Sequence, residues 1–315
     1  MTVATDVKHV GVVGTGLIGA SWAAYFLSRG LAVSASDPAP GAESALRRAV
    51  DAAWPVLERL GTVRGASTDR LRFSPHLDTA LEGVQFVQES GPEREPVKME
   101  LFSKIDCALP REATIASSSS GLSITKLQSH CRFPERCVIG HPFNPPHLIP
   151  LVEVVGGART AAETVDRTMA FYRGVGKRPI RVNKELKGHV VNRMQAALWH
   201  EAASLVAEGV VSVTDVDAAI ALGPGLRWAI MGPLLTLHLG GGPGGLRYWF
   251  DNVSKLRPGD AVGRAVMSPE LIDILVKGVE EEAAGRSVPE LMHERDEKLL
   301  GLFQAIGLSK DCLRA

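Results

Sequence analysis

The sequence has few of the features that would mark a small secreted or nucleic-acid-binding protein. Its 315 residues include only four cysteines, Cys107, Cys131, Cys137 and Cys312, without the CxxC spacing of a metal or redox site. A chain of this length does not need disulfides to support its core, so we expect reduced thiols. Basic and acidic residues are equal in number, 35 each, which gives no electrostatic reason to expect a nucleic acid or a membrane surface as partner.

Long apolar runs and a secretion signal are also missing. The first residues, MTVATDVKHVGVVG, have no charged region followed by an uninterrupted apolar segment. No apolar stretch reaches the roughly 20 residues that a transmembrane helix requires. We therefore expect a cytoplasmic protein, and its length and 45% hydrophobic residues are typical of a globular protein with two domains.

Short β-branched segments alternate with longer amphipathic segments from residue 8 to about 182. This alternation is typical of βαβ units that wind a mostly parallel sheet. The predicted strands are HVGVVG, LAVSAS, VQFVQES, ATIASSS, RCVIGH, LVEVV and RPIRV. After about residue 185 helical periodicity replaces these segments. We predict an α/β fold with an N-terminal Rossmann-like, doubly wound sheet in residues 1–184 and an all-helical C-terminal domain in residues 185–315.

The predicted helical domain has recognisable helix ends. The segment VNRMQAALWHEAASLVAEGV has apolar residues at helical spacing and ends at Gly209. Residues 223–249 are dense in glycine and aromatic residues, which indicates close backbone packing at an interface or a pocket. Candidate N-caps of the later helices are Ser212 or Thr214, Ser268 and Ser287.

The segment VVGTGLIGASWAAYF contains a GxGxxG pattern between a predicted strand and a predicted helix. The glycines permit a tight turn, the approach of a pyrophosphate and close packing of the helix on the strand. Free amide groups and the dipole at the start of the helix attract phosphates. The residues of this predicted nucleotide site are Gly14, Gly16, Leu17, Ile18 and Gly19.

Asp37 follows the second predicted strand, 18 residues beyond Gly19. A carboxylate at this position accepts hydrogen bonds from both ribose hydroxyls of NAD and repels the 2′-phosphate of NADP. We therefore predict NAD as the cofactor. In the alternative interpretation, Asp37 is only a turn residue before Pro38.

Five motifs in order resemble the L-3-hydroxyacyl-CoA dehydrogenase family. They are the nucleotide motif, VQESGPEREPVK, ASSSSGLSIT, GHPFNPPHLIPLVEVV and GHVVNRMQAALWHEA, within residues 8–240. The segment GLRWAIMGPLLTLHLGGGPGGLRYW and the tail after it resemble the branch of that family with L-carnitine dehydrogenase, L-gulonate 3-dehydrogenase and lambda-crystallin. The resemblance implies reversible, NAD-dependent oxidation of an L-3-hydroxyacyl group to its 3-keto form, a role in fatty acid metabolism, and a homodimer formed through the helical domain.

The resemblance further implies that His141 and Glu153, on the two sides of a proline-rich turn, are the catalytic pair. Imidazole titrates near neutral pH, so it can take the hydroxyl proton while hydride leaves the same carbon. A carboxylate on the other ring nitrogen fixes the tautomer and stabilises the imidazolium. From the residues alone, His141 is equally a hydrogen-bonded histidine at a strand end, and Glu153 a surface residue of an edge strand.

The same resemblance gives roles to four further polar residues. Ser120 matches the serine that contacts the substrate oxygen, and Ser118 lies on the cofactor side. Asn144 and Asn192 match asparagines near the substrate carbonyl and the nicotinamide, where an amide offers both a donor and an acceptor. In the alternative interpretation, the serines cap a helix, Asn144 forms an Asx turn and Asn192 caps the long helix.

Glu93 and Lys98 match residues near the nicotinamide ribose in the family; otherwise they are exposed residues in the first turn of a helix. The sequence departs from the family pattern at three positions. Gly121 replaces a serine and Ser118 replaces an asparagine, which suggests an altered pocket, and Lys187 replaces a proline at the entry to the long helix.

The sequence of the tail is compatible with two substrate classes, a CoA thioester and a free acid. An arginine there can pair with a free carboxylate, and aromatic rings can enclose a quaternary ammonium such as that of carnitine. Alternatively, these side chains belong to the core or to a dimer interface. Two further functions are compatible with the sequence, a biosynthetic 3-ketoreductase and a crystallin-like protein without turnover. The intact histidine and glutamate argue against the crystallin-like protein. The tail residues concerned are Arg227, Trp228, Arg247, Tyr248 and Trp249.

Overall fold

The computed structural model describes residues 7–253 and 269–305, so the candidate cap Ser268 and the thiol of Cys312 lie outside the described residues. It separates the chain into two compact units, Met1–Met194 and Gln195–Ala315. The division falls within helix α7 (Val191–Ala207), whereas the predicted boundary after residue 184 precedes this helix.

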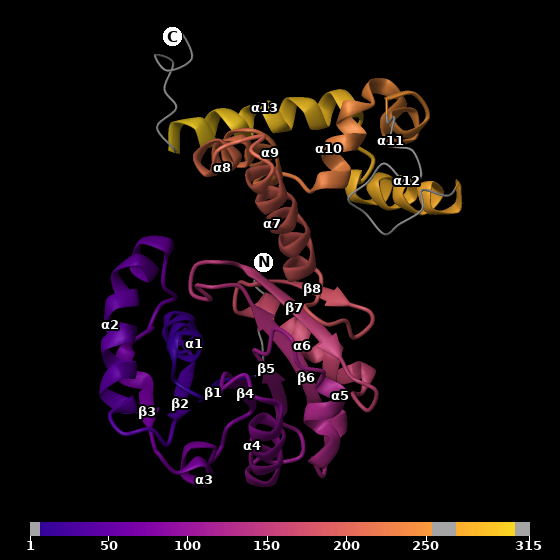
Figure 1. Ribbon diagram of the computed structural model, residues 1–315. Coiled ribbons are helices and arrows are strands. Elements are labelled where there is room, and N and C mark those ends of the chain that lie inside the picture. Colours follow the sequence, from indigo (N-terminus) through magenta and orange to yellow (C-terminus); the bar gives the residue numbers. More distant parts are fainter. Residues whose placement is uncertain (1–6, 254–268, 306–315) are drawn as a thin grey trace. The chain divides into compact units, whose positions relative to one another are not determined.

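The first unit contains an eight-stranded sheet in the order β3-β2-β1-β4-β5-β6-β7-β8 (Figure 1). Neighbouring strands are parallel except for the antiparallel pair β6 and β7. The α/β prediction and all seven predicted strands are confirmed; the three-residue strand β3 was not predicted. The strands are β1 (His9–Val13), β2 (Ala32–Ser36), β3 (Leu71–Phe73), β4 (Phe86–Glu89), β5 (Thr114–Ser117), β6 (Cys137–Pro142), β7 (Leu151–Gly156) and β8 (Arg178–Val182).

Helices cover both faces of this sheet and create two apolar cores. Trp22, Phe26 and Phe171 belong to the core on the side of α1, α2 and α6. Phe102 and Ile124 belong to the core on the side of α3, α4 and α5. The helices are α1 (Leu17–Ser28), α2 (Ala42–Leu60), α3 (Leu77–Ala80), α4 (Glu95–Ala108), α5 (Ile124–Leu127) and α6 (Ala162–Gly174). Short 3-10 turns lie at Thr68–Arg70, Gln128–His130 and Pro134–Arg136.

Strand alternation decides which way the candidate catalytic side chains face. Ile139 of β6 and Val155 of β7 pack in the core on the α4 and α5 side. His141 and Glu153 lie two residues from them along the same strands, so they share this face of the sheet. The antiparallel register places His141 directly opposite Glu153.

The second unit is helical throughout its described residues, as predicted. Its small core includes Leu235, Leu239, Leu246 and Val279. After α7, whose chain leaves the helix at the left-handed Gly209, the helices are α8 (Val213–Leu222), α9 (Pro224–Trp228), α10 (Pro233–Gly240), α11 (Gly245–Tyr248), α12 (Pro269–Ala283) and α13 (Val288–Ala305), with a 3-10 turn at Gly242–Gly244 and a π-helical turn at Trp249–Val253.

Two predicted caps and the predicted close packing of the glycine-rich segment are confirmed. Ser212 accepts a hydrogen bond from the Asp215 amide at 3.1 Å, and Ser287 forms a reciprocal capping box with Glu290. A Cβ atom added to Gly244 would lie 2.4 Å from the Cβ of Tyr248, so glycine is needed for this close packing.

No single helix of the described residues has both the length and the apolar character to cross a membrane. The helical segments Val213–Trp228 and Pro233–Gly240 meet these criteria only when taken together, and they are bent by 84° to each other.

Candidate active site

A cavity of about 780 Å³ opens beside the glycine-rich turn. It lies where the strand order reverses between β1 and β4, the position at which open α/β sheets bind ligands. Gly14, Gly16 and Asp37 line one part of it, and Ser90 and Gly91 line the part at the end of β4. The cavity therefore joins the predicted nucleotide residues from β1 and β2 to the end of β4.

Each glycine of the turn has a distinct geometry. Gly14 has φ +86°, and a Cβ atom there would lie 2.6 Å from the backbone of Gly91. A Cβ atom on Gly19 would lie 1.9 Å from the Gly14 carbonyl oxygen, so only glycine allows α1 to pack this close to the turn. Gly16 has open space around its missing side chain, which leaves room for a pyrophosphate at the start of α1. Leu17 is exposed and Ile18 half-buried in the first turn of that helix.

Asp37 is held between the glycine-rich turn and the end of β2. Its Oδ2 accepts a hydrogen bond from the Thr15 amide at 2.9 Å, and its Oδ1 accepts one from the Ala39 amide at 3.0 Å. The second bond is that of an ordinary Asx turn, as in the alternative interpretation. The first bond fixes the carboxylate at the wall of the cavity.

We expect NADH to bind at least tenfold more tightly than NADPH, because the fixed Asp37 carboxylate would repel a 2′-phosphate. Titration calorimetry with both reduced cofactors measures the ratio. Asp37→Asn should narrow the ratio by removing the charge, while Asp69→Asn, on an exposed 3-10 turn, serves as the control. Equal affinities in the unmodified protein would remove Asp37 from this role.

His141 and Glu153 form a buried pair at the carboxyl end of β6. His141 Nδ1 lies 2.8 Å from Glu153 Oε2, and the side chains are 7% and 0% exposed. Because Glu153 lies on a strand between β6 and β8, its interpretation as a surface residue of an edge strand is wrong. The bond occupies Nδ1 of the imidazole, so Nε2 is the nitrogen that can accept a proton.

The second oxygen of Glu153 is also held. Oε1 accepts hydrogen bonds from the amides of Val190 and Val191 at 2.9 and 3.0 Å, at the start of α7. Burial by itself raises the pKa of Glu153, but the hydrogen bonds from His141 and from the two amides outweigh it and keep this pKa below its ordinary value. The carboxylate is therefore ionised at neutral pH and oriented at both oxygens.

Two further rings contact the His141 imidazole. The Phe143 ring meets it edge-on with 5.0 Å between ring centroids, and the His189 ring lies 5.1 Å away. His189 is buried, and its Nε2 lies 3.1 Å from the carbonyl oxygen of Ser119. Burial lowers the pKa of His189, and the nearby His141 lowers it further, against the opposing effect of the Ser119 carbonyl.

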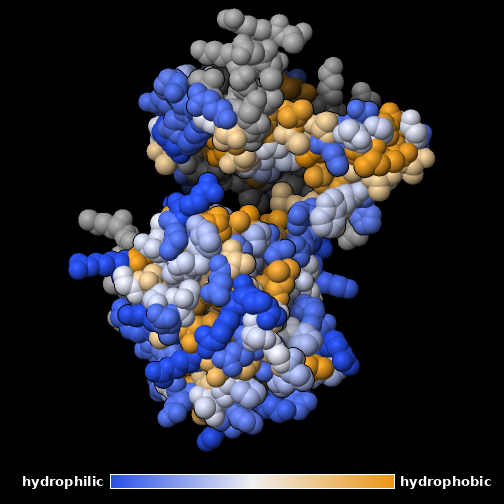
Figure 2. Space-filling view, turned by 90° about the vertical axis from the view of Figure 1, so that its left-hand side faces the viewer, coloured by the Kyte–Doolittle hydropathy of each residue, from blue (hydrophilic) through white to orange (hydrophobic). Residues whose placement is uncertain are grey.

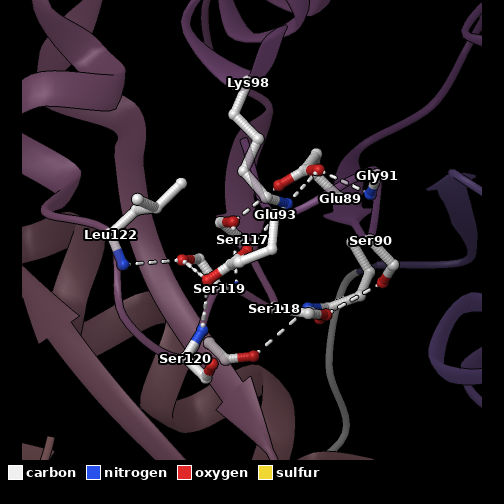
Figure 3. Close-up of polar contacts among 12 residues, drawn as sticks. Glu89, Ser90, Gly91, Glu93, Lys98, Ser117, Ser118, Ser119, Ser120 and Leu122 are labelled. Atoms are coloured by element: carbon white, nitrogen blue, oxygen red, sulfur yellow. Dashed lines mark hydrogen bonds and ion pairs between the residues drawn. The ribbon is translucent and has the colours of Figure 1, made fainter. Parts of the chain in front are cut away.

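A second polar cluster lies at the ends of β4 and β5 (Figure 3). The buried Glu89 carboxylate accepts hydrogen bonds at 2.6 Å from Lys98 Nζ, Ser117 Oγ and the Gly91 amide. Lys98 also lies 3.6 Å from Glu93 Oε2. Since Lys98 is only 1% exposed, its interpretation as an exposed helix residue is wrong.

Glu93 fixes the loop that follows β5. Its Oε1 accepts hydrogen bonds from Ser119 Oγ at 2.6 Å and from the amides of Ser120 and Gly121 at 3.0 and 3.2 Å. Ser118 Oγ instead contacts the side chains of Ser90 and Gln88, at 2.9 and 2.8 Å. We call residues 118–120, which follow β5, the serine loop. Helix α5 begins after Ser123, so the serine loop does not cap it.

Side chains from other parts of the chain hold the proline-rich turn between β6 and β7. The Lys177 ammonium donates to the carbonyl oxygens of Pro146 and Ile149, and Ser21 Oγ hydrogen-bonds both Nδ1 and the amide of His147. Asn144 lies exposed in this turn.

The two halves of the chain match two family models. The model described as 3-hydroxyacyl-CoA dehydrogenase, NAD binding domain, matches residues 9–186, and the model described as 3-hydroxyacyl-CoA dehydrogenase, C-terminal domain, matches residues 188–272. The chain belongs to the 3-hydroxyacyl-CoA dehydrogenase family. It is an NAD-dependent oxidoreductase that acts on a CH–OH group, which confirms the predictions of activity and cofactor.

The similarity to known proteins covers nearly the whole chain. L-carnitine dehydrogenase of Streptomyces coelicolor is 48% identical over 309 residues, which cover 98% of this chain and 97% of that protein. The crystal structure of FHMPC 5-dehydrogenase, an NAD-dependent dismutase, has a TM-score of 0.76 at 30% identity and covers 96% of this chain and 99% of its own. A 3-hydroxyacyl-CoA dehydrogenase from Archaeoglobus fulgidus has a TM-score of 0.71 at 25% identity, covering 96% and 100%.

The remaining predicted residues of the dehydrogenase lie on α7 and in the helical unit. Asn192 is the second residue of α7, so it does not precede the helix as an N-cap does. Arg247 forms an ion pair with Asp273 of α12, and Trp249 packs edge-on against Phe250. Arg227, Trp228 and Tyr248 are exposed.

The sequence did not single out Glu89 or His189. Glu89 had one signal: a Gln-Glu pair ends the otherwise apolar strand FVQE, where buried polar side chains require a partner. His189 stands within the motif GHVVNR, but its contact with His141 joins residues 48 positions apart. No local pattern predicts that distance.

Proposed function

We propose that this dehydrogenase oxidises L-carnitine, a free 3-hydroxy acid with a quaternary ammonium group, to its 3-keto form. The similarity to L-carnitine dehydrogenase over 98% of this chain supports the substrate. The oriented pair of His141 and Glu153 is the single observation that carries the chemistry.

The pair performs the proton transfer in this proposal. NAD, when bound, supplies the hydride acceptor. His141 takes the hydroxyl proton at Nε2 while Nδ1–H donates to Glu153. The ionised Glu153 fixes this tautomer and stabilises the imidazolium that forms. The positive end of α7 and the amides of Val190 and Val191 favour the ionised carboxylate.

The other predicted residues complete the proposed site. Ser120 and Asn192 would contact the substrate oxygen, and Ser118 and Asn144 would lie on the cofactor side. Glu93 and Lys98 would border the nicotinamide ribose. Their mutual bonds support this role, because Glu93 holds the Ser120 amide and Lys98 lies beside Glu93.

A substrate comparison tests the proposal. NADH formation is measured with L-carnitine, L-3-hydroxybutyrate, L-gulonate and 3-hydroxybutyryl-CoA. We expect kcat/KM for L-carnitine to exceed that for 3-hydroxybutyrate, its matched analogue without the ammonium group, by roughly 100-fold. The second candidate function is oxidation of an acyl-CoA substrate in fatty acid metabolism, which the family model favours. In that case the enzyme would have its highest kcat/KM with 3-hydroxybutyryl-CoA.

We also propose a cytoplasmic homodimer that forms through the helical unit. Hydrophobic residues lie at the surface of this unit (Figure 2), and large apolar side chains such as Trp199, Val210 and Leu222 are more than half exposed. Contiguous exposed apolar surface is typical of an interface. Sedimentation equilibrium should give about twice the 33.7 kDa of one chain, and a monomeric mass would contradict the proposal.

A further inference from the structure

His189 has an unusual position just before α7. It is 3% exposed, yet its backbone is left-handed at φ +49°, a conformation that is strained for residues other than glycine. Such a conformation persists only where the surroundings hold it. The surroundings here include the serine loop, because Nε2 of the ring lies 3.1 Å from the Ser119 carbonyl oxygen.

The tautomer of His189 follows from this contact. A carbonyl oxygen only accepts hydrogen bonds, so Nε2 carries the proton and Nδ1 does not. Nδ1 is buried and has no hydrogen-bond partner in the part of the chain that the structure describes. A protonated ring would bury a second donor without an acceptor, next to the imidazole of His141. Burial also lowers the pKa of His189, in the same direction.

His189 therefore connects two parts of the proposed site. Its side chain holds the serine loop, in which Ser120 matches the serine that contacts the substrate. The amides of the next two residues, Val190 and Val191, hold Glu153 and through it His141. Glu93 also fixes the serine loop, through a different group of the same residue, Ser119 Oγ.

We propose that His189 is a positioning residue: its Nε2–H bond to Ser119 sets the serine loop at a fixed distance from the His141 and Glu153 pair. The inference rests on the proposed function, in which that pair takes the hydroxyl proton. A proton acceptor that is misplaced by about 1 Å loses on the order of 100-fold in rate, so a short rigid link between the two parts has a measurable effect.

Three substitutions of His189 separate the hydrogen bond from the volume of the ring. The glutamine amide nitrogen is as many bonds from Cβ as Nε2 of histidine, so His189→Gln can keep the donor, whereas His189→Asn is too short. His189→Phe keeps a ring without a donor. We expect kcat with the best substrate of the four above to fall roughly 10- to 100-fold in the Phe and Asn variants and to stay within about threefold in the Gln variant.

The KM for NAD should stay within about threefold in all three variants, since neither His189 nor the serine loop lines the nucleotide cavity. His9→Phe is the matched control. His9 is a half-buried histidine of the same unit whose ring contacts the Gly83 carbonyl and Ser34 Oγ at the start of β1. This variant should keep the kcat of the unmodified protein.

Two results would overturn the inference: kcat within twofold in both the Phe and Asn variants, or Gln no better than Asn. If the Phe variant does not fold, as circular dichroism would show, the comparison of Gln with Asn decides. Failure of the proposed function is seen separately, because His141→Ala would then stay active. An inactive His141→Ala protein together with an unaffected His189→Phe protein rejects the inference on His189 alone.

Discussion

Replacing His141 by alanine is expected to lower kcat by on the order of 10²-fold or more, because the hydroxyl proton loses its acceptor. The affinity for NADH should not change, since the nucleotide cavity is lined by residues of other strand ends. Initial rates of NADH formation give kcat, and fluorescence titration gives the NADH affinity. Both measurements are needed, because a general loss of folding would lower the two together.

The control for this variant is His130→Ala, which removes an exposed histidine of the same unit. It should leave both quantities unchanged. Full activity of the His141→Ala protein would reject the assignment of the base, and with it the proposed chemistry.

Glu153→Gln is expected to lower kcat by up to about 10⁴-fold, the loss that follows when the carboxylate of a histidine–carboxylate pair is replaced by an amide. The amide nitrogen would donate to Nδ1 of His141 and so move the ring proton to Nε2, where it blocks proton acceptance. The amide oxygen can still accept the bonds of Val190 and Val191, so α7 should begin at the same residue. Glu163→Gln, on the exposed start of α6, is the control.

The same variant tests the pKa of Glu153. A carboxyl group whose pKa is lower in the folded than in the unfolded protein stabilises the fold above the unfolded pKa, and this contribution is lost as the pH falls through the folded value. The unfolding free energy of the unmodified protein should therefore fall as the pH drops below about 4.5, the ordinary value for glutamate. The unfolding free energy of the Gln variant should lack this part of the decrease. Denaturation curves of both proteins at several pH values measure the difference. An identical pH dependence of the two unfolding free energies would contradict the lowered pKa.

Much of the fold was accessible from local patterns. Strands that are buried on both faces appear as apolar, β-branched runs, and six of the seven predicted strands are of this kind. The seventh, β8, has two arginines and is partly exposed, and it also became a strand. Strand β3, with the sequence LRF, is three residues long and has a charged centre, so it carries no such pattern. Helix caps are also local, and Ser212 and Ser287 were recognisable for that reason.

For the active site, the sequence predicted only candidate residues and not their surroundings. The family motifs named His141, Glu153 and Lys98, but their surroundings depend on contacts distant in sequence. Glu153 is held by amides 37 and 38 positions away, and the ion pair of Lys98 with Glu89 depends on the end of a neighbouring strand. The burial of Lys98 therefore contradicted a reasonable local expectation, since lysine in a first helical turn is usually solvated.

The direct opposition of His141 and Glu153 on two paired strands has a consequence for how such a protein can change during evolution. The register of the two paired strands, and not the length of the turn between them, keeps the two side chains face to face. A single deletion within β6 or β7 would send one of the two side chains to the opposite face of the sheet. The register of β6 and β7 is therefore the feature of this pair that tolerates the least change.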